Sequence, residues 1–225
     1  MIKRSVFLLL ILLSGVSFIS SSRSSPIKKP EIIDNSKYIL CVPEGIDISK
    51  KYPLVVALSP SADAESMIKT WQDVSNKYKW IIFASKENRN EINLIEFIPE
   101  LATLIEEISS EFPVDRSKII ATGLSGGGMS AHAFCFSYPK LISAVVVNTG
   151  ITHEYYRERI NEYPRGKLVV FLASPTDFRY EEMKRDRDFL ENLGWKVKWV
   201  EFKGGHKIAP SSAYEETAEW LQGQF

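Results

Sequence analysis

Lys118 to Gly128 read K-I-I-A-T-G-L-S-G-G-G, and this stretch decides how the rest of the chain is interpreted. The apolar run Lys118–Thr122 is typical of a buried strand, and residues 129–138 have helical character. A G-x-S-x-G sequence between a strand and a helix forms so sharp a turn that its serine is strained, with room only for glycine two residues before and after it. Ser125 is therefore the candidate nucleophile. The alternative is a glycine-rich turn with an incidental serine.

The composition describes one globular domain without an unusual charge. The 225 residues are 44% hydrophobic and 25% charged, which is enough apolar material for a full core. The 28 basic and 28 acidic residues balance and are mixed along the chain. Nothing in this pattern favours a nucleic acid or an anionic membrane surface as a partner, so we expect neither.

The N-terminus has the pattern of a secretory signal. Lys3 and Arg4 precede the apolar stretch Val6–Ile19, which is too short to span a bilayer and is followed by the small polar residues 20–25. We predict a signal peptide over 1–24, with an approximate cleavage site, and a linker over 25–36. The mature protein would be secreted or periplasmic, without stable membrane insertion after cleavage. An uncleaved N-terminal anchor is the alternative.

Cysteine usage is sparse for an exported chain. Export places the protein in an oxidising compartment, yet it contains only Cys41 and Cys135, too few for a disulfide framework. Cys41 lies in a strand-like run and Cys135 in the helix after Ser125. We predict two buried free thiols, with a disulfide between them as the open alternative.

Short apolar runs alternate with amphipathic segments from residue 37 to the C-terminus. The predicted strands cover residues 38–42, 53–58, 80–84, 118–122, 144–147, 167–173 and 195–202, and the predicted helices cover 67–78, 97–108, 129–138, 183–193 and 214–221. Continuously apolar strands separated by helices indicate a mostly parallel sheet covered on both faces. The sequence therefore predicts a single doubly wound α/β domain over 37–225, with ligands at the C-terminal ends of its strands.

A serine nucleophile needs a base, and the chain has three histidines. His206 follows the last strand in the loop Lys203-Gly204-Gly205, where two glycines allow the backbone to bend back over the sheet. His132 lies seven residues after Ser125, about two helical turns away, and is predicted to be a packed or surface helix residue. His153 could line the pocket, but it comes before every candidate acid at a later strand end. His206 is our candidate base, and an exposed loop histidine is the alternative.

The orienting acid is expected after the penultimate strand. Leu168–Ala173 leads through Ser174-Pro175-Thr176 into Asp177, which could also be a simple turn or N-cap residue. Asp186 and Asp188 are the rivals, and both are predicted to face solvent on the following helix. The order Ser125, Asp177, His206, each after a separate strand, is the order of a catalytic triad on this kind of sheet.

The segment from Val114-Asp115-Arg116-Ser117-Lys118 to Gly123-Leu124-Ser125-Gly126-Gly127-Gly128-Met129-Ser130-Ala131 resembles the secreted polyhydroxybutyrate depolymerase and feruloyl esterase-like branch of the α/β-hydrolases. The resemblance implies a single-domain α/β-hydrolase fold and cleavage of aromatic, acetyl or polyester-type carboxylic esters, either small or polymer-borne. The expected chemistry needs no cofactor and no metal. The segment Thr149–Arg165 is too short for a large lid, so we expect an open site.

One departure from this family concerns the oxyanion hole, the pair of N–H donors that stabilises the reacting oxygen. The family usually has His-Gly after its first long central strand, whereas here Leu58 is followed by Ser59-Pro60-Ser61-Ala62, and proline has no N–H. We predict the N–H of Gly126 as one donor and that of Ser61 as the other, unless the loop is only a turn. A secreted serine peptidase of the same fold and a non-catalytic binding protein remain alternatives.

Overall fold

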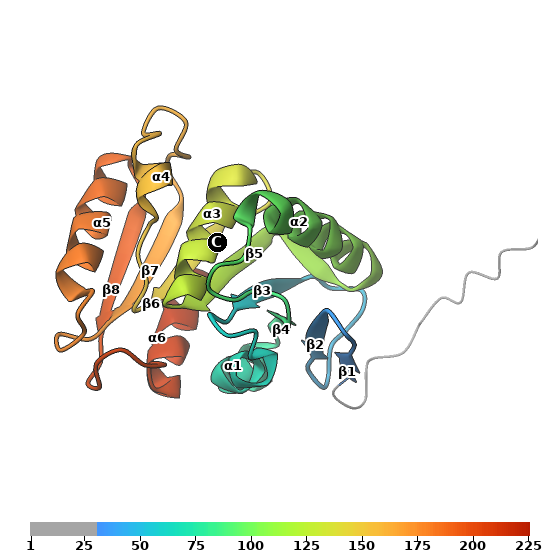
Figure 1. Cartoon of the computed structure of the whole chain (residues 1–225). Helices are drawn as coiled ribbons and strands as arrows, with labels where there is room; N and C mark the ends of the chain where they lie inside the picture. The colour runs from blue at the N-terminus through green and yellow to red at the C-terminus, as the bar shows by residue number, and fades with distance from the viewer. Residues whose placement is uncertain (1–30) are drawn as a thin grey trace, which may run out of the picture.

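The computed structural model describes residues 31–225 (Figure 1). The predicted signal peptide and the first residues of the predicted linker lie outside this range. The described strands are β1 (Glu31–Asp34), β2 (Tyr38–Val42), β3 (Tyr52–Leu58), β4 (Ile81–Ser85), β5 (Val114–Leu124), β6 (Ala144–Asn148), β7 (Leu168–Ala173) and β8 (Lys196–Glu201). The helices are α1 (Ala64–Tyr78), α2 (Leu94–Glu111), α3 (Gly126–Ser137), α4 (Glu154–Arg157), α5 (Tyr180–Asn192) and α6 (Ser211–Gln222).

The strands form one eight-stranded sheet in the order β1-β2-β4-β3-β5-β6-β7-β8. From β4 through β3 to β8 all neighbours pair in parallel, whereas β1 and β2 are antiparallel to their neighbours. The parallel strands are joined by helices, which return the chain to the same end of the sheet. The predicted doubly wound α/β fold is confirmed.

Helices cover both faces of this sheet (Figure 1). One apolar core lies between the sheet and α2, α3 and α5, and the second lies between the sheet and α1 and α6. The central strands are buried on both faces, which explains why they read as continuous apolar runs instead of alternating ones. The short α4, with four residues, is the helical part of the segment between β6 and β7, so the site has no large lid.

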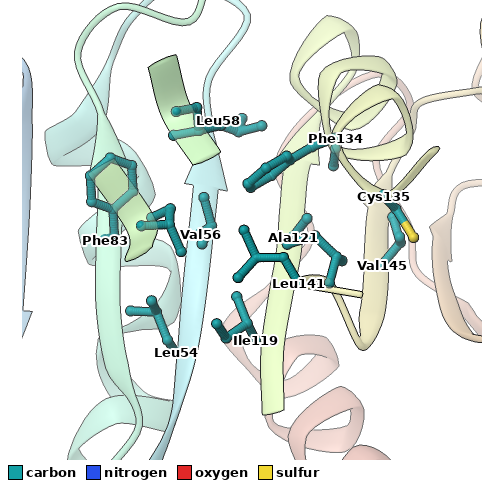
Figure 2. Close-up of a cluster of buried hydrophobic side chains, with 14 of the residues drawn as sticks. Leu54, Val56, Leu58, Phe83, Ile119, Ala121, Phe134, Cys135, Leu141 and Val145 are labelled. Carbon is teal, nitrogen blue, oxygen red and sulfur yellow. The ribbon is translucent and has the colours of Figure 1, made fainter. Parts of the chain in front are cut away.

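Figure 2 shows the centre of the first core. Leu54 and Val56 from β3 lie beside Ile119 and Ala121 from β5, and Phe134 reaches toward them from α3. All five side chains are fully buried. This contact fixes β3, β5 and α3 relative to one another, and the turn that contains Ser125 joins two of these three elements.

The boundaries differ from the prediction at the N-terminal edge and in β5. The sequence predicts a linker over 25–36, whereas Glu31–Asp34 forms β1 and pairs with β2. Strand β5 begins at Val114 and not at Lys118, because Tyr52 pairs with Val114 before the register shifts in the ladder. Both extensions lie at partly exposed strand ends, where apolar periodicity carries little information. Among residues 31–225, no helix is both long and apolar enough to cross a membrane.

Both cysteines are buried and free, on opposite faces of the sheet. Cys41 contributes to the core beneath α1 and α6, and Cys135 to the core beneath α3. Burial raises the pKa of the Cys41 thiol and raises that of Cys135 to about 12. The sheet between them prevents a disulfide in the folded protein.

We expect neither thiol to react with a thiol-specific chromogenic reagent at pH 8 in the native state, because both are shielded and protonated. Both should react at once in denaturant without any reductant. Replacing each cysteine singly by alanine should lower the denatured count by one. Rapid labelling of the native protein, or a denatured protein that needs reductant before it labels, would contradict this arrangement.

Candidate active site

The nucleophile turn lies at the C-terminal end of β5, in the middle of the sheet. Ser125 has φ 52° and ψ −116°, a backbone conformation that a residue with a side chain adopts only under strain. Its N–H donates to the carbonyl of Asn148 at 2.9 Å, and its own carbonyl accepts from the amides of Gly128 and Met129 as α3 begins. The strain is therefore held by hydrogen bonds on both sides of the turn.

The glycines of the motif permit a close approach of three backbone segments. A Cβ atom on Gly123 would overlap the backbone of Gly127 and lie 2.6 Å from the Leu58 carbonyl oxygen. A Cβ atom on Gly127 would overlap that same oxygen. The G-x-S-x-G spacing thus reflects the contact between the elbow, the first turn of α3 and the end of β3.

The structure brings together the three predicted triad residues. The Nε2 atom of His206 lies 2.8 Å from Ser125 Oγ, and the Nδ1 atom lies 2.8 Å from Asp177 Oδ2. The three side chains come from the loops after β5, β7 and β8, which meet at one edge because the strands are parallel. This relay lets the imidazole take a proton from the hydroxyl while the carboxylate fixes its tautomer.

Asp177 is buried, with no exposed area on its side chain. Its Oδ1 atom accepts the N–H of Arg179 at 2.7 Å, and its Oδ2 atom faces His206. Asp177 therefore stabilises its own turn and also contacts the imidazole. Its predicted role as the orienting acid and the alternative role as a turn residue are compatible. The N-cap position of α5 belongs to Arg179.

The loop that carries His206 is shaped by its two glycines. Gly204 and Gly205 have φ values of 147° and 72°, which favour glycine. The N–H of Gly205 donates to the buried Ser174 hydroxyl at 2.9 Å, which ties the loop to the end of β7. Although the loop is at the surface, its backbone is thus anchored beside the imidazole.

The predicted oxyanion donors differ in whether their N–H groups already have a hydrogen-bond partner. Gly126 is the first residue of α3, where an N–H has no partner within the helix and the helix dipole favours negative charge. The N–H of Ser61 donates to Ser59 Oγ at 3.2 Å, a long bond. The N–H of Ala62 donates to the carbonyl of Asn88 at 2.8 Å and is therefore occupied. Of the two amides after Pro60, that of Ser61 is the more available.

Sequence reasoning missed a second loop, after β4, that braces the Ser59–Ala62 segment. The buried Asn88 donates its Nδ2 atom to the carbonyl of Ser59 at 2.6 Å, and the N–H of Asn90 donates to the carbonyl of Pro60 at 2.7 Å. The Asn90 carboxamide also lies against Gly126. The sequence signal was the presence of two asparagines just after a strand end, which could have indicated this polar brace.

A cavity of about 260 Å³ opens beside Gly126. Its lining mixes apolar, charged and polar side chains: Arg89, Asn90, Glu91, Ile92, Leu94, Gly126, Met129, Ser130 and His153. His153 is exposed and also caps α4 through its Nδ1 atom, which accepts the N–H of Tyr155 at 3.1 Å. Of these two histidines, His206 is the one in contact with Ser125, and His153 belongs to the wall of the cavity.

Phe178 lies against the imidazole of His206. Its ring centroid is 4.6 Å from that of His206, yet the residue is 74% exposed. Large apolar side chains at this level of exposure are uncommon among the described residues, and this one directly covers the imidazole. A ligand that reaches Ser125 therefore meets an aromatic face next to His206.

Comparison with known proteins gives matches to hydrolases. No protein-family model matches the chain. Among curated proteins, it is 28% identical over 130 residues to a probable feruloyl esterase C from Aspergillus terreus, covering 53% of this chain and 48% of that protein. It is 27% identical over 190 residues to flap endonuclease 1 of Methanocaldococcus jannaschii, covering 73% and 56%. The chain thus spans about half the length of the curated relatives it matches.

Comparison with solved structures gives the fold. A serine hydrolase from Staphylococcus aureus, FphF, named as fluorophosphonate-binding, aligns with a TM-score of 0.67 at 12% identity over 86% of this chain and 98% of that one. A thermostable esterase aligns with a TM-score of 0.61 at 20% identity, over 86% of this chain and 62% of that one. The chain has the α/β-hydrolase fold. The predicted fold class is confirmed, and the depolymerase branch of the resemblance stays a prediction.

One prediction about the acidic residues of this chain is wrong. Asp188 is exposed as expected, but Asp186 is buried, because its position on α5 faces α4 and not solvent. Asp186 accepts the N–H of Thr152 at 2.6 Å and pairs with Arg157 at 2.6 Å. Burial outweighs these partners and raises its pKa to about 6. It lies in a different polar cluster from the triad, so it is no rival to Asp177.

His132 belongs to the same buried cluster. It is fully buried on α3, and its Nδ1 atom lies 3.2 Å from the hydroxyl of Tyr163. Burial, with a smaller contribution from the positive charge of Arg157, lowers the pKa of His132 to about 3. The side chain is therefore neutral in the folded protein at ordinary pH and makes no contact with Ser125.

We expect His132→Gln to reduce the pH dependence of the free energy of unfolding. Between pH 6.5 and 3 the unfolded chain binds a proton at His132 that the folded protein excludes, so the free energy of unfolding falls as pH decreases below 6.5. At pH 5 this loss is about 2 kcal/mol. Asp186 acts in the opposite direction over pH 6 to 3.8, because its folded form keeps the proton longer.

The measurement is denaturant unfolding of the native and variant proteins at pH 7 and pH 5. The difference between the two pH values should be smaller in His132→Gln by about 2 kcal/mol. Ser137→Ala, an exposed substitution on the same helix that removes no ionisable group, is the control and should keep the native difference. An unchanged pH dependence in His132→Gln would show that burial does not lower the pKa of His132 in the folded protein.

Proposed function

We propose that the protein is a serine hydrolase that cleaves carboxylic esters through an acyl-enzyme intermediate. The observation that carries the proposal is the continuous relay from Asp177 through His206 to Ser125, with both contacts at 2.8 Å. Geometry of this kind, on a sheet edge that ligands can reach, is the recognised arrangement for activating a hydroxyl. The similarity to a probable feruloyl esterase supports an ester as the substrate.

In the acylation step, Ser125 Oγ attacks the ester carbonyl carbon while His206 Nε2 takes the hydroxyl proton. The carbonyl π electrons move to oxygen and form the tetrahedral oxyanion. When this collapses, the bond to the alcohol oxygen breaks and His206 returns its proton to that oxygen. The alcohol leaves, and the acyl group remains on Ser125.

In the deacylation step, a water molecule takes the place of the alcohol. His206 accepts a proton from the water as its oxygen attacks the acyl carbon, and the proton then passes to Ser125 Oγ as the acid leaves. Asp177 remains a carboxylate throughout and stabilises the imidazolium that forms in each half-reaction. Both half-reactions conserve the charge and protons of the site, so the chemistry calls for no cofactor.

The oxyanion would be stabilised by the N–H groups of Gly126 and Ser61. Gly126 has the favourable position at the start of α3. For Ser61 to contribute, its N–H must exchange the long bond to Ser59 Oγ for the substrate oxygen. The brace from Asn88 and Asn90 supports this loop, which lowers the cost of presenting the amide.

The surroundings of the triad suggest how an ester lies in the site. Because His206 must return a proton to the leaving oxygen, the alcohol group lies on the His206 side, next to Phe178. The acyl group then extends toward the cavity beside Gly126. An exposed aromatic face favours an alcohol with a planar or apolar surface, such as an aryl, sugar-linked or polyester alcohol. The N-terminal signal pattern supports export, so such esters would be met outside the cytoplasm.

We expect Ser125→Ala to lower turnover of p-nitrophenyl acetate by about 10⁴-fold or more, because the attacking oxygen is lost. A fluorophosphonate probe should label the native protein at Ser125 and should not label the variant. Ser137→Ala, at the other end of α3, is the matched control for turnover and for thermal stability.

The outcomes separate the alternatives. Turnover of peptides but not of esters would assign the protein to the peptidases. Failure of the probe to label a folded native protein would favour the non-catalytic binding protein. Full turnover by Ser125→Ala would show that the relay is not the catalytic site.

We expect Phe178→Ala to reduce kcat/KM for benzyl acetate about 3- to 10-fold more than for ethyl acetate, since only the benzyl group can stack on the ring. Both esters share one acyl group, which isolates the alcohol side. Phe178→Trp should keep the preference for the benzyl ester.

Ile95→Ala is the surface control, because Ile95 is 84% exposed and lies on α2. An equal loss for both esters in Phe178→Ala would mean that the ring only holds His206 in place. Unchanged kinetics with both esters would place the alcohol group elsewhere.

A further inference from the structure

Asn148 is the last residue of β6 and is buried beneath the loop that carries His206. Its Nδ2 atom donates to the carbonyl of Lys207 at 3.0 Å and to Thr149 Oγ1 at 3.2 Å. Its Oδ1 atom accepts the N–H of Ala209 and the hydroxyl of Tyr214, both at 2.7 Å. All four hydrogen-bonding capacities of the carboxamide are used.

The partners fix which way this carboxamide points. Lys207 offers a backbone carbonyl, which can only accept, and Ala209 offers a backbone N–H, which can only donate. A carboxamide rotated by half a turn would place two acceptors together and two donors together. Among side chains of this length, only asparagine provides one donor and one acceptor for these two groups without having to be protonated.

The backbone of the same residue supports the nucleophile. The carbonyl of Asn148 accepts the N–H of Ser125 at 2.9 Å. Two residues on, a Cβ atom at Gly150 would lie 2.7 Å from the Ser125 carbonyl oxygen. Asn148 thus contacts the elbow through its backbone and the His206 loop through its side chain.

The backbone next to Asn148 is strained. Thr149 has φ 44°, which is rare for a β-branched residue. Its N–H bonds to the carbonyl of Leu172 at 3.0 Å, and its hydroxyl accepts from Asn148. Strain of this kind persists where the surroundings over-determine it, and here it accompanies the contact between Ser125 and the His206 loop.

We infer that Asn148 is the positioning residue that sets the distance between Ser125 and His206. This inference rests on the proposed function, because the distance matters for proton transfer. His206 itself is at the surface, and the buried carboxamide holds the backbone immediately after it on Lys207 and Ala209. Without this link the imidazole would sample positions away from Ser125 Oγ.

The kinetic test is Asn148→Ala with p-nitrophenyl acetate as substrate. A loss of alignment of about 1 Å lowers kcat by about 10²-fold, with KM changed by less than about 3-fold, because the substrate surfaces are untouched. The matched control is Thr217→Val, which removes a buried hydroxyl that bonds to the carbonyl of Ala213 on α6. It should lower Tm without lowering kcat.

Asn148→Asp carries the test if the alanine variant does not fold. Aspartate has the same shape but, once ionised, cannot donate to the carbonyl of Lys207. The kcat of this variant should fall as pH rises from 6 to 9, whereas the wild-type value should not. A purely structural residue would alter Tm in either variant and leave the pH profile as it is.

A spectroscopic arm separates this inference from the proposed function. Proton NMR of the full chain should show a downfield imidazole proton from the His206–Asp177 bond, lost or broadened in Asn148→Ala and retained in Thr217→Val. If the wild type cleaves no ester and takes no fluorophosphonate, the proposed function fails, and this signal still tests Asn148. A wild-type kcat together with an unchanged signal in Asn148→Ala, or a wild-type kcat for Asn148→Asp at pH 9, overturns the inference.

Discussion

The approach of the Ser125 turn to the end of β3 is the constraint on which the site depends. Gly123 and Gly127 leave no room for a side chain between the elbow, the first turn of α3 and the carbonyl of Leu58. The strained serine is held there by the buried contact between β3, β5 and α3 that Figure 2 shows. Because these three elements form one packed unit, the position of the hydroxyl is decided by the core and not by the flexible surface.

The sequence predicted the elements that follow from apolar periodicity, and with them the parallel sheet and the three strand ends that meet at the triad. Ser125, Asp177 and His206 could be selected because each follows a strong strand signal. Burial of Asp186 could not be predicted in this way. The helix that carries Asp186 is rich in charged residues. Asp186 is buried because it contacts Arg157 and Thr152, which lie in a distant segment of the chain.

The availability of the proposed second oxyanion donor, the N–H of Ser61, was the hardest feature of the site to predict, for a related reason. Its availability depends on hydrogen bonds between two loops, in which Asn88 and Asn90 bind the backbone of Ser59 and Pro60. Such contacts leave no periodic trace in a sequence, since an asparagine in a loop is equally compatible with a turn. The Pro60 departure is accommodated because the proline keeps its carbonyl, which accepts the N–H of Asn90.

The His206 loop has to leave the imidazole accessible and also hold it in a fixed position, and these two requirements conflict. In the proposed hydrolysis the imidazole has to be accessible to substrate, so its loop cannot be covered by a lid, yet proton transfer tolerates little displacement. The structure separates the two demands: His206 lies at the surface, while the polar groups that hold its loop, Ser174 and Asn148, are buried at the ends of β7 and β6. Since those strands are part of the same sheet as the elbow, Ser125 and His206 share one rigid support although they are far apart in the chain.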